Sequence, residues 1–493
     1  MSEVTFVDTT LRDGNQSLWA YNMRTAAMLE AIEGMDRAGF ESMEFFSATM
    51  IKKYVREHKE NPWRWIREGT KRARNTSLRM HGSIRGGLEK KPTSVAKLVV
   101  SHLVDNGIRL TRNSNPWNDY AVFKQEVDDL RELGMDAVAN IIYSVSPRHT
   151  DEYYAQKARE VAALKPYRIC FKDVGGMLTP ERTRTLVPIV LENIGDIPVE
   201  FHAHCNNGLA PLNYLEAIKL GMTTIHTSVP PLDNGSAQPS IFNMLRNVRA
   251  MGHTATVDEK ALEPVRDHFT FVAKRDGLPM GAPRAFDQSV YSHQVPGGMI
   301  SNFVHQLRLV GMEDKLPAAL EEAARVREEW GYPIMVTPLS QFVGTQAAIN
   351  VIMGERYKQV TDQSIQYALG LWGRQGAEYM DPGVKDRILG RPRAKAWENW
   401  EQPDPSLKEV RAKLGGPSMS DEDMIMRVYA GDEAVEALQN AGRPREYLSA
   451  SQPLVRLINE LTRQQEYTQV YIRKPGFSLT LGRSADASDG AAG

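Results

Sequence analysis

Two spacings of hydrophobic residues alternate along the first part of the chain. Short, largely apolar runs such as Val4–Val7 and Ser42–Phe46 are separated by longer segments in which apolar residues recur every three or four positions. One such segment extends from Thr25 to Ala38, and Gly39 follows it at a position that favours a left-handed residue. This alternation is typical of a parallel sheet whose strands are connected by helices.

The pattern repeats often enough to predict a closed barrel. Further strands are expected near Leu78–Met80, Ile108–Thr111, Ala137–Tyr143, Tyr167–Phe171, Pro198–His202 and Thr224–Thr227. With the first two, these make eight strand–helix units, which predict an α/β fold of the TIM (β/α)8 barrel type. We expect the barrel domain to occupy residues 1–300.

The pattern changes after the expected barrel. Helical segments dominate there and are expected at 312–330, 341–354, 362–371, 406–414 and 421–430, with breaks at Pro333, Pro338 and Arg391–Arg393. They predict a second, mainly helical C-terminal domain over residues 301–475. The remaining residues, 476–493, end in a small and polar stretch, and we expect them to be disordered.

Composition and charge narrow the class of protein. The chain has 493 residues and a net charge of -1, so no charge excess favours nucleic acid or an anionic membrane. It lacks an apolar run of the roughly 18 residues that a membrane-spanning helix needs. The first strand begins close to the N-terminus, so we expect no signal peptide. With only two cysteines, a disulfide framework is excluded and a cytoplasmic location is expected.

Four chemically distinctive residues follow the ends of expected strands. These are Asp13, Lys172, His202 and His204. Reactive groups of TIM barrels lie at the C-terminal ends of the strands, so all four are expected at one rim. The His-x-His spacing places both imidazoles on the same face of a strand, because side chains alternate with period two. Imidazoles with a carboxylate suit zinc, manganese or cobalt.

Lys172 does not fit this ligand set as an ordinary lysine. An ammonium group has no lone pair, so Lys172 is either structural or modified. A carbamate, formed by addition of CO2 to the amine, would make it a carboxylate ligand. Any one of these residues alone would more often be a satisfied polar group, but the four together favour a metal site. Cys170 and Cys205 flank the proposed ligands; a thiolate ligand stays open, although ordinary packing of both thiols is favoured.

Two of these segments carry a resemblance to a known family. Leu11–Ser17 and Phe171–Pro180 resemble motifs of the biotin-dependent carboxyltransferases, which include the central domain of pyruvate carboxylase, the alpha subunit of oxaloacetate decarboxylase and the central subunit of transcarboxylase. Counterparts also occur for Tyr143–Thr150, Val295–Met299, Val336–Gln346 and Gly354–Tyr357. The resemblance extends over most of the chain, from residue 4 to about residue 435, and is closest to the stand-alone subunits.

The resemblance implies a reaction and a role for each matched residue. The reaction moves a carboxyl group between carboxybiotin and a small 2-oxo acid of the pyruvate or oxaloacetate type. Asp13, carboxylated Lys172, His202 and His204 would bind the metal, and Thr337 would relay a proton between substrate and biotin. The resemblance further implies catalytic positions for Lys172, Arg12 and Gln16, substrate-binding positions for Gln16, Arg85 and Arg112, and biotin-side positions for Thr337 and Ser340.

The sequence departs from the family pattern where the substrate would bind. The usual L-L-R-G segment, whose arginine holds the pyruvate carboxylate, is replaced by Met80–Gly86, with Arg85 displaced by two positions. An aspartate after the second strand is missing from Ser47–Ile51, and an acid after the fourth strand becomes the amide Asn115. These changes predict a substrate other than pyruvate.

No biotin-accepting Met-Lys-Met motif and no glycine-rich phosphate loop occur in the sequence. We therefore expect biotin on a separate carrier protein, biotin carboxylase or decarboxylase partner subunits, and a homodimer of this chain.

Two rival hypotheses stay open. A metal-dependent aldol-type lyase or synthase, resembling isopropylmalate synthase and hydroxymethylglutaryl-CoA lyase, would share Asp8–Gly14 and the His202-x-His204 pair. Lys172 and the matched C-terminal segments argue against it. The other is a non-catalytic scaffold, and the complete ligand set together with Thr337 argues against that.

Overall fold

The computed structural model describes residues 2–84, 91–295, 300, 303–304, 307–309, 311–442, 457–458, 461 and 468–482. Contacts between residues divide the chain into two compact units, Met1–Pro444 and Arg445–Gly493. The barrel and most of the helices that follow it lie in the first unit.

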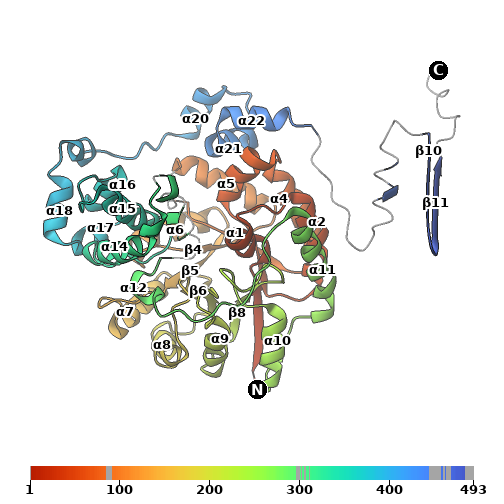
Figure 1. Ribbon diagram of the computed structural model, residues 1–493, viewed down its shortest axis with the longest axis horizontal. Helices are drawn as coiled ribbons and strands as arrows, with labels where there is room; N and C mark the ends of the chain where they lie inside the picture. The colour runs from red at the N-terminus through yellow and green to blue at the C-terminus, as the bar shows by residue number, and fades with distance from the viewer. Residues whose placement is uncertain are drawn as a thin grey trace. The chain divides into compact units, whose positions relative to one another are not determined.

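The centre of the first unit is a closed barrel of eight parallel strands (Figure 1). The strands are β1 (Glu3–Asp8), β2 (Ser42–Phe46), β3 (Ser77–His81), β4 (Leu110–Asn113), β5 (Asp136–Ile142), β6 (Arg168–Asp173), β7 (Val199–Ala203) and β8 (Thr224–Thr227). Each strand pairs with the next, and β8 pairs with β1 to close the ring. The short β9 (Thr254–Ala255) adds to β1. The predicted barrel and all its strands are confirmed.

Helices surround the barrel, as Figure 1 shows. They are α2 (Thr25–Arg37), α4 (Pro62–Arg72), α5 (Thr93–Asp105), α6 (Tyr120–Glu132), α7 (Asp151–Ala163), α8 (Pro180–Asn193), α9 (Ala210–Lys219), α10 (Ile241–Ala250) and α11 (Glu259–Asp276). Side-chain caps fix where several begin: Thr150 accepts a hydrogen bond from the backbone of Tyr153, and Thr179 from that of Arg182. Short loops with such caps set the positions of the residues at the barrel rim.

A mainly helical region follows the barrel, as predicted. It contains α14 (Leu316–Glu329), α15 (Leu339–Met353), α16 (Asp362–Ala368), α17 (Arg374–Tyr379) and α18 (Pro382–Leu389). Its core packs around the fully buried Trp330, and Trp117, from the segment between β4 and α6, belongs to the same cluster. The barrel and these helices therefore share apolar packing. The expected domain boundary at residue 300 stays a prediction, because residues 296–299 lie outside the described part of the chain.

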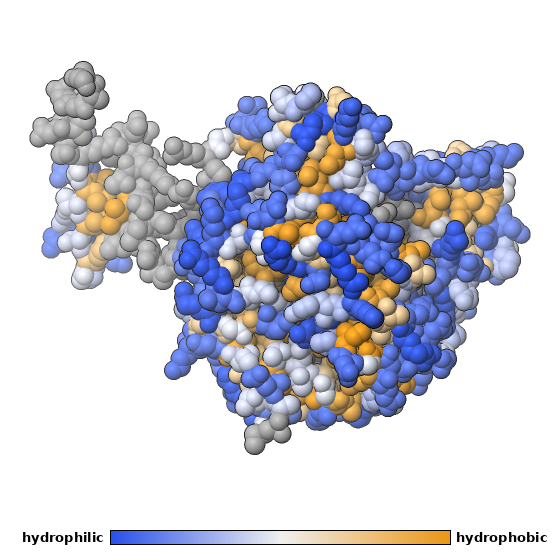
Figure 2. All heavy atoms as spheres, turned by 180° about the vertical axis from the view of Figure 1, so that it is seen from behind, coloured by the Kyte–Doolittle hydropathy of each residue, from blue (hydrophilic) through white to orange (hydrophobic). Residues whose placement is uncertain are grey.

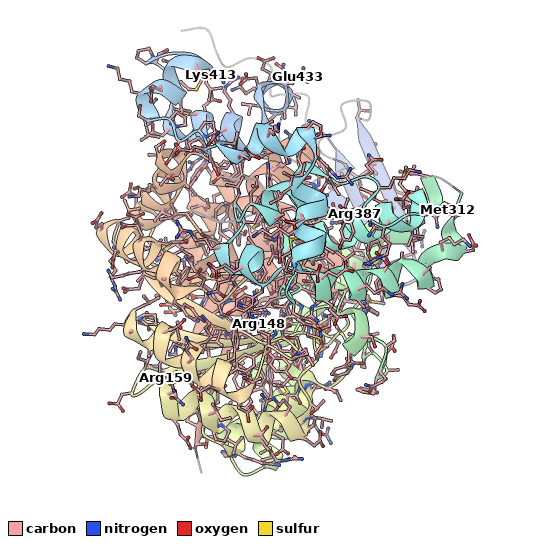
Figure 3. The ribbon with its side chains drawn as sticks, turned by 90° about the vertical axis from the view of Figure 1, so that its left-hand side faces the viewer. Arg148, Arg159, Met312, Arg387, Lys413 and Glu433 are labelled. Atoms are coloured by element: carbon pink, nitrogen blue, oxygen red, sulfur yellow. The ribbon has the colours of Figure 1, made fainter. Side chains whose placement is uncertain are left out.

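The last helices of this unit return to the barrel. They are α20 (Leu407–Leu414), α21 (Asp421–Ala430) and α22 (Asp432–Gln439). Figures 1 and 3 show them at one edge of the unit, apart from α14–α18, with Lys413 and Glu433 labelled in Figure 3. Helix α21 packs against α5 and α3 (Ala48–Lys53). The sequence predicted α20 and α21 but not α17, α18 or α22, because such short segments give little periodic signal.

The second unit corrects one expectation. Strands β10 (Gln469–Lys474) and β11 (Phe477–Gly482) form an antiparallel hairpin. Residues 477–482 were expected to be disordered; their alternation of apolar and polar residues, which suits a strand, was missed beside the small, polar residues that follow. Residues 483–493 lie outside the described range.

Hydrophilic residues predominate on the face of the molecule seen in Figure 2, with apolar patches between them. In the described part of the chain, no helix has both the length and the apolar character that crossing a membrane requires.

Replacing Trp330 with alanine should destabilise the first unit strongly. Its ring is fully buried in the helical cluster, so truncation leaves a cavity and should lower the free energy of unfolding by about 3–5 kcal/mol. Denaturant unfolding followed by circular dichroism measures this change. The matched control is Leu309→Ala, at a side chain that is 72% exposed, which should change the same quantity by less than about 0.5 kcal/mol. An equal loss in both variants would contradict the prediction.

Candidate active site

The segment after β1 folds back onto the barrel rim. A single π-helical turn, Thr10–Gly14, leads into α1 (Asn15–Trp19). Asp8, the last residue of β1, anchors this turn by accepting hydrogen bonds from the backbone and the hydroxyl of Thr10, at 3.1 and 2.5 Å. Gly14 allows close contact, since a Cβ there would lie 2.7 Å from the carbonyl oxygen of Leu232. The turn directs Asp13 toward the barrel axis.

Asp13, which follows the first strand of the barrel, lies close to two histidines at the end of the seventh strand. Oδ2 of Asp13 lies 3.3 Å from Nε2 of His202 and 3.6 Å from Nε2 of His204. The two Nε2 atoms are 3.2 Å apart, and all three residues are buried. The structure thus brings together three of the four residues at the point that the strand-end positions predicted.

Hydrogen-bond partners fix where the protons of the two rings lie. Nδ1 of His204 is 2.6 Å from the carbonyl oxygen of Ser236, which can only accept, so this Nδ1 carries the proton. Burial lowers the pKa of both imidazoles, so both rings are neutral and Nε2 of His204 is an acceptor. Burial opposes ionisation of Asp13, but Arg12 and the imidazoles hold its pKa well below the usual range.

A second histidine pair fixes the proton of His202. Its Nδ1 lies 3.0 Å from Nδ1 of His226, whose Nε2 lies 2.9 Å from Oε1 of Glu200. The carboxylate only accepts, so the proton of His226 is on Nε2, and its Nδ1 accepts the proton of His202. Nε2 of His202 is thereby left with a lone pair, and it lies 3.3 Å from Oδ2 of Asp13 and 3.3 Å from the amide nitrogen of Gln238, which can donate to it. A carboxylate oxygen and two imidazole nitrogens that carry lone pairs thus converge, and these ligand types suit a divalent cation.

His226 and Glu200 were not among the residues predicted from the sequence. A signal was present: Glu200 and His202 are two residues apart on β7, so both point into the barrel, and β8 contributes a third polar residue beside them. Arg79 donates to Glu200 at 2.8 Å and balances its charge. Together these residues form a column of polar side chains below Asp13, His202 and His204. We call these three candidate ligands the metal-type site.

Lys172 lies beside this group. It pairs in register with His202 on the neighbouring strand, and its Nζ is 3.4 Å from Oγ of Ser114. Burial, reinforced by the positive charge of Arg112, lowers the pKa of Lys172 to about 7. A large share of this amine is therefore uncharged near neutral pH, and only an uncharged amine adds CO2.

Two buried arginines hold the surroundings of Asp13. Arg12 donates to Oδ2 of Asp13 at 2.7 Å and to Oε2 of Glu44 at 2.7 Å. Arg112 donates from Nε to Oε1 of Glu44 at 2.5 Å. Within the described part of the chain, neither Nη1 nor Nη2 of Arg112 has a hydrogen-bond partner. Buried N–H donors beside Lys172 and Asp13 are thus available to a further negatively charged oxygen.

A cavity of about 390 Å³ opens above these residues. Gln16, Lys172, Thr337 and Ser340 line it, together with Asp13 and His204. Thr337 and Ser340 come from the helical region, so the cavity lies between that region and the barrel rim. Of the two arginines predicted to bind substrate, Arg112 is fully buried beneath the site and is not among the described residues that line the cavity. Arg85 lies outside the described part of the chain.

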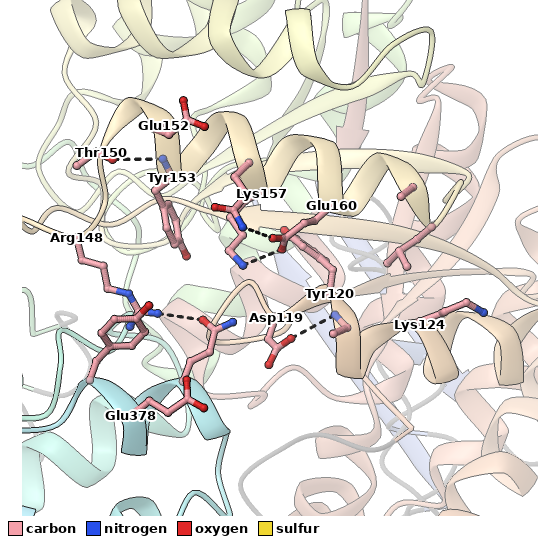
Figure 4. A pocket seen from close by; sticks show the side chains of 16 residues that line it. Asp119, Tyr120, Lys124, Arg148, Thr150, Glu152, Tyr153, Lys157, Glu160 and Glu378 are labelled. Carbon is pink, nitrogen blue, oxygen red and sulfur yellow. Dashed lines mark hydrogen bonds and ion pairs between the residues drawn. The ribbon is translucent and has the colours of Figure 1, made fainter.

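Two further features lie outside this constellation. Burial raises the pKa of Cys170 and Cys205, so both are neutral thiols rather than ready ligands. A wider groove of about 790 Å³ on the outside of the barrel (Figure 4) is lined by none of the proposed metal ligands. There Arg148 donates to Gln375 at 3.0 Å and stacks on Tyr379, joining the barrel to the helical region.

Two family models match successive parts of the chain. Residues 3–268 match the HMGL-like family model, and residues 290–474 match the conserved carboxylase domain. The first match covers the barrel that aldol-type lyases share. The second covers the helical region and does not favour the lyase alternative.

Curated relatives are similar over most of the chain. It is 35% identical to a pyruvate carboxylase subunit of Methanocaldococcus jannaschii, over 78% of this chain and 68% of that protein. It is 30% identical to the 2-oxoglutarate carboxylase large subunit of Hydrogenobacter thermophilus, over 87% of this chain and 67% of that protein. It is also 30% identical to the methylmalonyl-CoA carboxyltransferase 5S subunit of Propionibacterium freudenreichii subsp. shermanii, over 86% of this chain and 85% of that protein.

A solved structure shares the fold. The carboxyl transferase domain of Rhizobium etli pyruvate carboxylase superposes with a TM-score of 0.81 at 21% identity, covering 98% of this chain and 84% of that one. The family models, the curated relatives and the fold agree, and the chain therefore belongs to the biotin-dependent carboxyltransferases of the pyruvate carboxylase type.

Proposed function

We propose that this chain is a metal-dependent carboxyltransferase subunit that moves a carboxyl group between carboxybiotin and a small 2-oxo acid other than pyruvate. The observation that carries the proposal is the convergence of three acceptor atoms, from Asp13, His202 and His204, on one buried point of the barrel rim. Carboxylate oxygens and imidazole nitrogens are the ligands that divalent transition metals take in proteins.

Zinc, manganese or cobalt fits these donors, and Lys172 would complete the set as a carbamate. The partly uncharged amine of Lys172 and the available donors of Arg112 support this modification, because a carbamate would place negative oxygens beside that guanidinium. A bound divalent cation supplies Lewis-acid chemistry, which stabilises the charge that develops on a carbonyl oxygen.

The protein's own residues position this chemistry. Arg12, held by Glu44, fixes the carboxylate of Asp13. Gln16 accepts hydrogen bonds from Arg12 at 3.2 Å and from Tyr21 at 2.8 Å, which leaves its amide nitrogen as a donor toward the cavity. Substrate in the cavity would therefore meet a donor on one side and the metal-type site on the other.

Thr337 is suited to carry the proton. It lines the cavity above the site and also lines a neighbouring cavity of about 410 Å³ that is bounded by Trp372 and Arg374. Biotin on a carrier would approach through this second space, with Ser340 on the same wall as Thr337. Oγ1 of Thr337 would accept the proton leaving the carbon next to the substrate carbonyl and pass its own proton to the ureido nitrogen of biotin.

The partners follow from the same chemistry. Several relatives are named as single subunits of an enzyme, which supports a complex of several chains. We propose a separate biotin carrier protein, biotin carboxylase or decarboxylase subunits, a homodimer of this chain and a cytoplasmic location. The relatives are named for pyruvate, 2-oxoglutarate and methylmalonyl-CoA, so the substrate varies within the family.

The metal is tested by its content in wild type and a ligand variant. We expect one divalent ion per chain, measured by elemental analysis of protein purified without chelator. His202→Ala removes a ligand that no distant group replaces, and should lose metal and carboxyl transfer together. His253→Ala, whose ring bonds Ser2 away from the site, should keep both. Occupancy well below half in the wild type would overturn the metal assignment.

The proton relay is tested by two substitutions at one position. Thr337→Ala should keep fold and metal but lower the rate of carboxyl transfer by about 10²–10⁴-fold, the usual contribution of a proton relay. Thr337→Ser restores the hydroxyl and should retain transfer within about tenfold of wild type. Transfer to a 2-oxo acid can be followed with a carboxylated biotin donor and radiolabelled carboxyl carbon. Near wild-type transfer by the alanine variant would exclude this role.

A further inference from the structure

The two histidines of the metal-type site are held in different ways. Nδ1 of His204 lies 2.6 Å from the backbone carbonyl oxygen of Ser236, so the main chain fixes this ring. The partner of Nδ1 of His202, within the described part of the chain, is a side-chain nitrogen, Nδ1 of His226 at 3.0 Å. The state of His202 as a ligand therefore depends on another side chain.

His226 packs against His202 inside the barrel. His226 lies on β8 and His202 on β7, and the residues that precede them, Ile225 and Phe201, pair in register. Both histidines are fully buried, their ring centres are 4.9 Å apart and their ring planes stand at 89° to each other. This nearly perpendicular packing brings one nitrogen of each ring together away from solvent.

Glu200 holds the other nitrogen of His226. Oε1 of Glu200 lies 2.9 Å from Nε2 of His226 and accepts a hydrogen bond from Nη1 of Arg79 at 2.8 Å. A carboxylate oxygen only accepts, so a neutral His226 carries its proton on Nε2. Glu200 and His202 are two residues apart on one strand and point to the same side, and His226 connects them.

Ligation by His202 requires its proton to be on one particular nitrogen. Nε2 of His202 lies 3.3 Å from Oδ2 of Asp13 and can bind a cation only through a lone pair, so the proton of a neutral His202 has to be on Nδ1. That proton needs an acceptor, which the unprotonated Nδ1 of His226 supplies. A proton on Nδ1 of His226 would instead favour the tautomer of His202 with its proton on Nε2, which cannot ligate.

We infer that His226, held by Glu200, is a positioning residue for the metal: it keeps the proton of His202 on Nδ1 and thereby sets the affinity of the metal-type site for a divalent cation. His226 is not itself a ligand, because its Nδ1 accepts from His202 and its Nε2 donates to Glu200. Groups that bond the far nitrogen of a ligating imidazole typically contribute about 10–100-fold to metal affinity. This inference rests on the proposed function, which places the cation at Asp13, His202 and His204.

The zinc affinity of two variants tests the inference. His226→Leu retains an apolar side chain but no acceptor, and should raise the dissociation constant for Zn²⁺ by about 10–100-fold. His226→Asn offers an amide oxygen near the place of Nδ1 and should keep the constant within about fivefold of wild type. Competition with a chromophoric chelator measures both. Equal affinity of the leucine variant and the wild type would overturn the inference.

The matched control is His268→Leu. His268 on α11 is also buried, and its Nε2 lies 2.9 Å from the carbonyl oxygen of Ala27. This variant loses a similar buried hydrogen bond away from the metal-type site and should leave the dissociation constant for Zn²⁺ unchanged. An equal loss of affinity in the control would assign the effect to general destabilisation and overturn the role of His226.

The proton positions can also be measured in the wild-type protein, which does not depend on the folding of a variant. In zinc-loaded protein with ¹⁵N-labelled histidine, two-bond correlations between ring protons and ring nitrogens distinguish the two tautomers. The signals that are missing from His226→Asn identify His226. We expect its proton on Nε2, and a proton on Nδ1 would overturn the inference.

The two proposals fail separately. Loss of zinc affinity in His226→Leu, from a wild-type protein without any carboxyl transfer, would support the positioning role and contradict the proposed function. Metal-dependent carboxyl transfer by the wild type, with unchanged zinc affinity in His226→Leu, would support the function and contradict the positioning role.

Discussion

Closure of the parallel sheet is the constraint on which the site depends. Strand β1 pairs with β2 on one side and with β8 on the other, so the chain's first strand lies close to its seventh and eighth. All strands run in one direction, and their C-terminal ends therefore meet at one rim. Asp13, which follows β1, thus reaches His202 of β7 and His204 just after it, across a distance that local structure could not bridge.

Charge balance inside the barrel keeps this rim in place. Glu44 accepts from both Arg12 and Arg112, and Glu200 accepts from Arg79 and His226. All of these side chains are buried, where an unpaired charge would be strongly destabilising. The pairing therefore does more than compensate burial: it orients Asp13 through Arg12 and, through His226, keeps the proton of His202 on Nδ1. The stability of the barrel and the geometry of its site depend on the same contacts.

The helical region contributes lining residues to the candidate site and does not only follow the barrel. Thr337 reaches the rim from the segment before α15, and Tyr429 of α21 lines a neighbouring cavity of about 330 Å³. Three cavities meet at Ser114 and Thr337. In the proposed function, the proton relay of Thr337 and the approach of carrier-bound biotin would share this centre.

The sequence by itself determined the strands, their order and the rim position of Asp13, Lys172, His202 and His204. Periodicity and strand-end placement are local properties, and barrel closure is a general consequence of eight such units. The sequence motifs also indicated the family, which the relatives bear out.

Only the tertiary structure decided which distant polar groups share protons and charge. His226, Glu200 and Glu44 carry no motif, and their importance appears only when β2, β7 and β8 lie within hydrogen-bond distance of the rim residues. It likewise moved Arg112 from an expected substrate contact to a buried position beneath the site, and it joined Lys52, Lys91 and Tyr429 around one cavity. Such contacts depend on the packing of segments far apart in the chain, which neither spacing nor composition encodes.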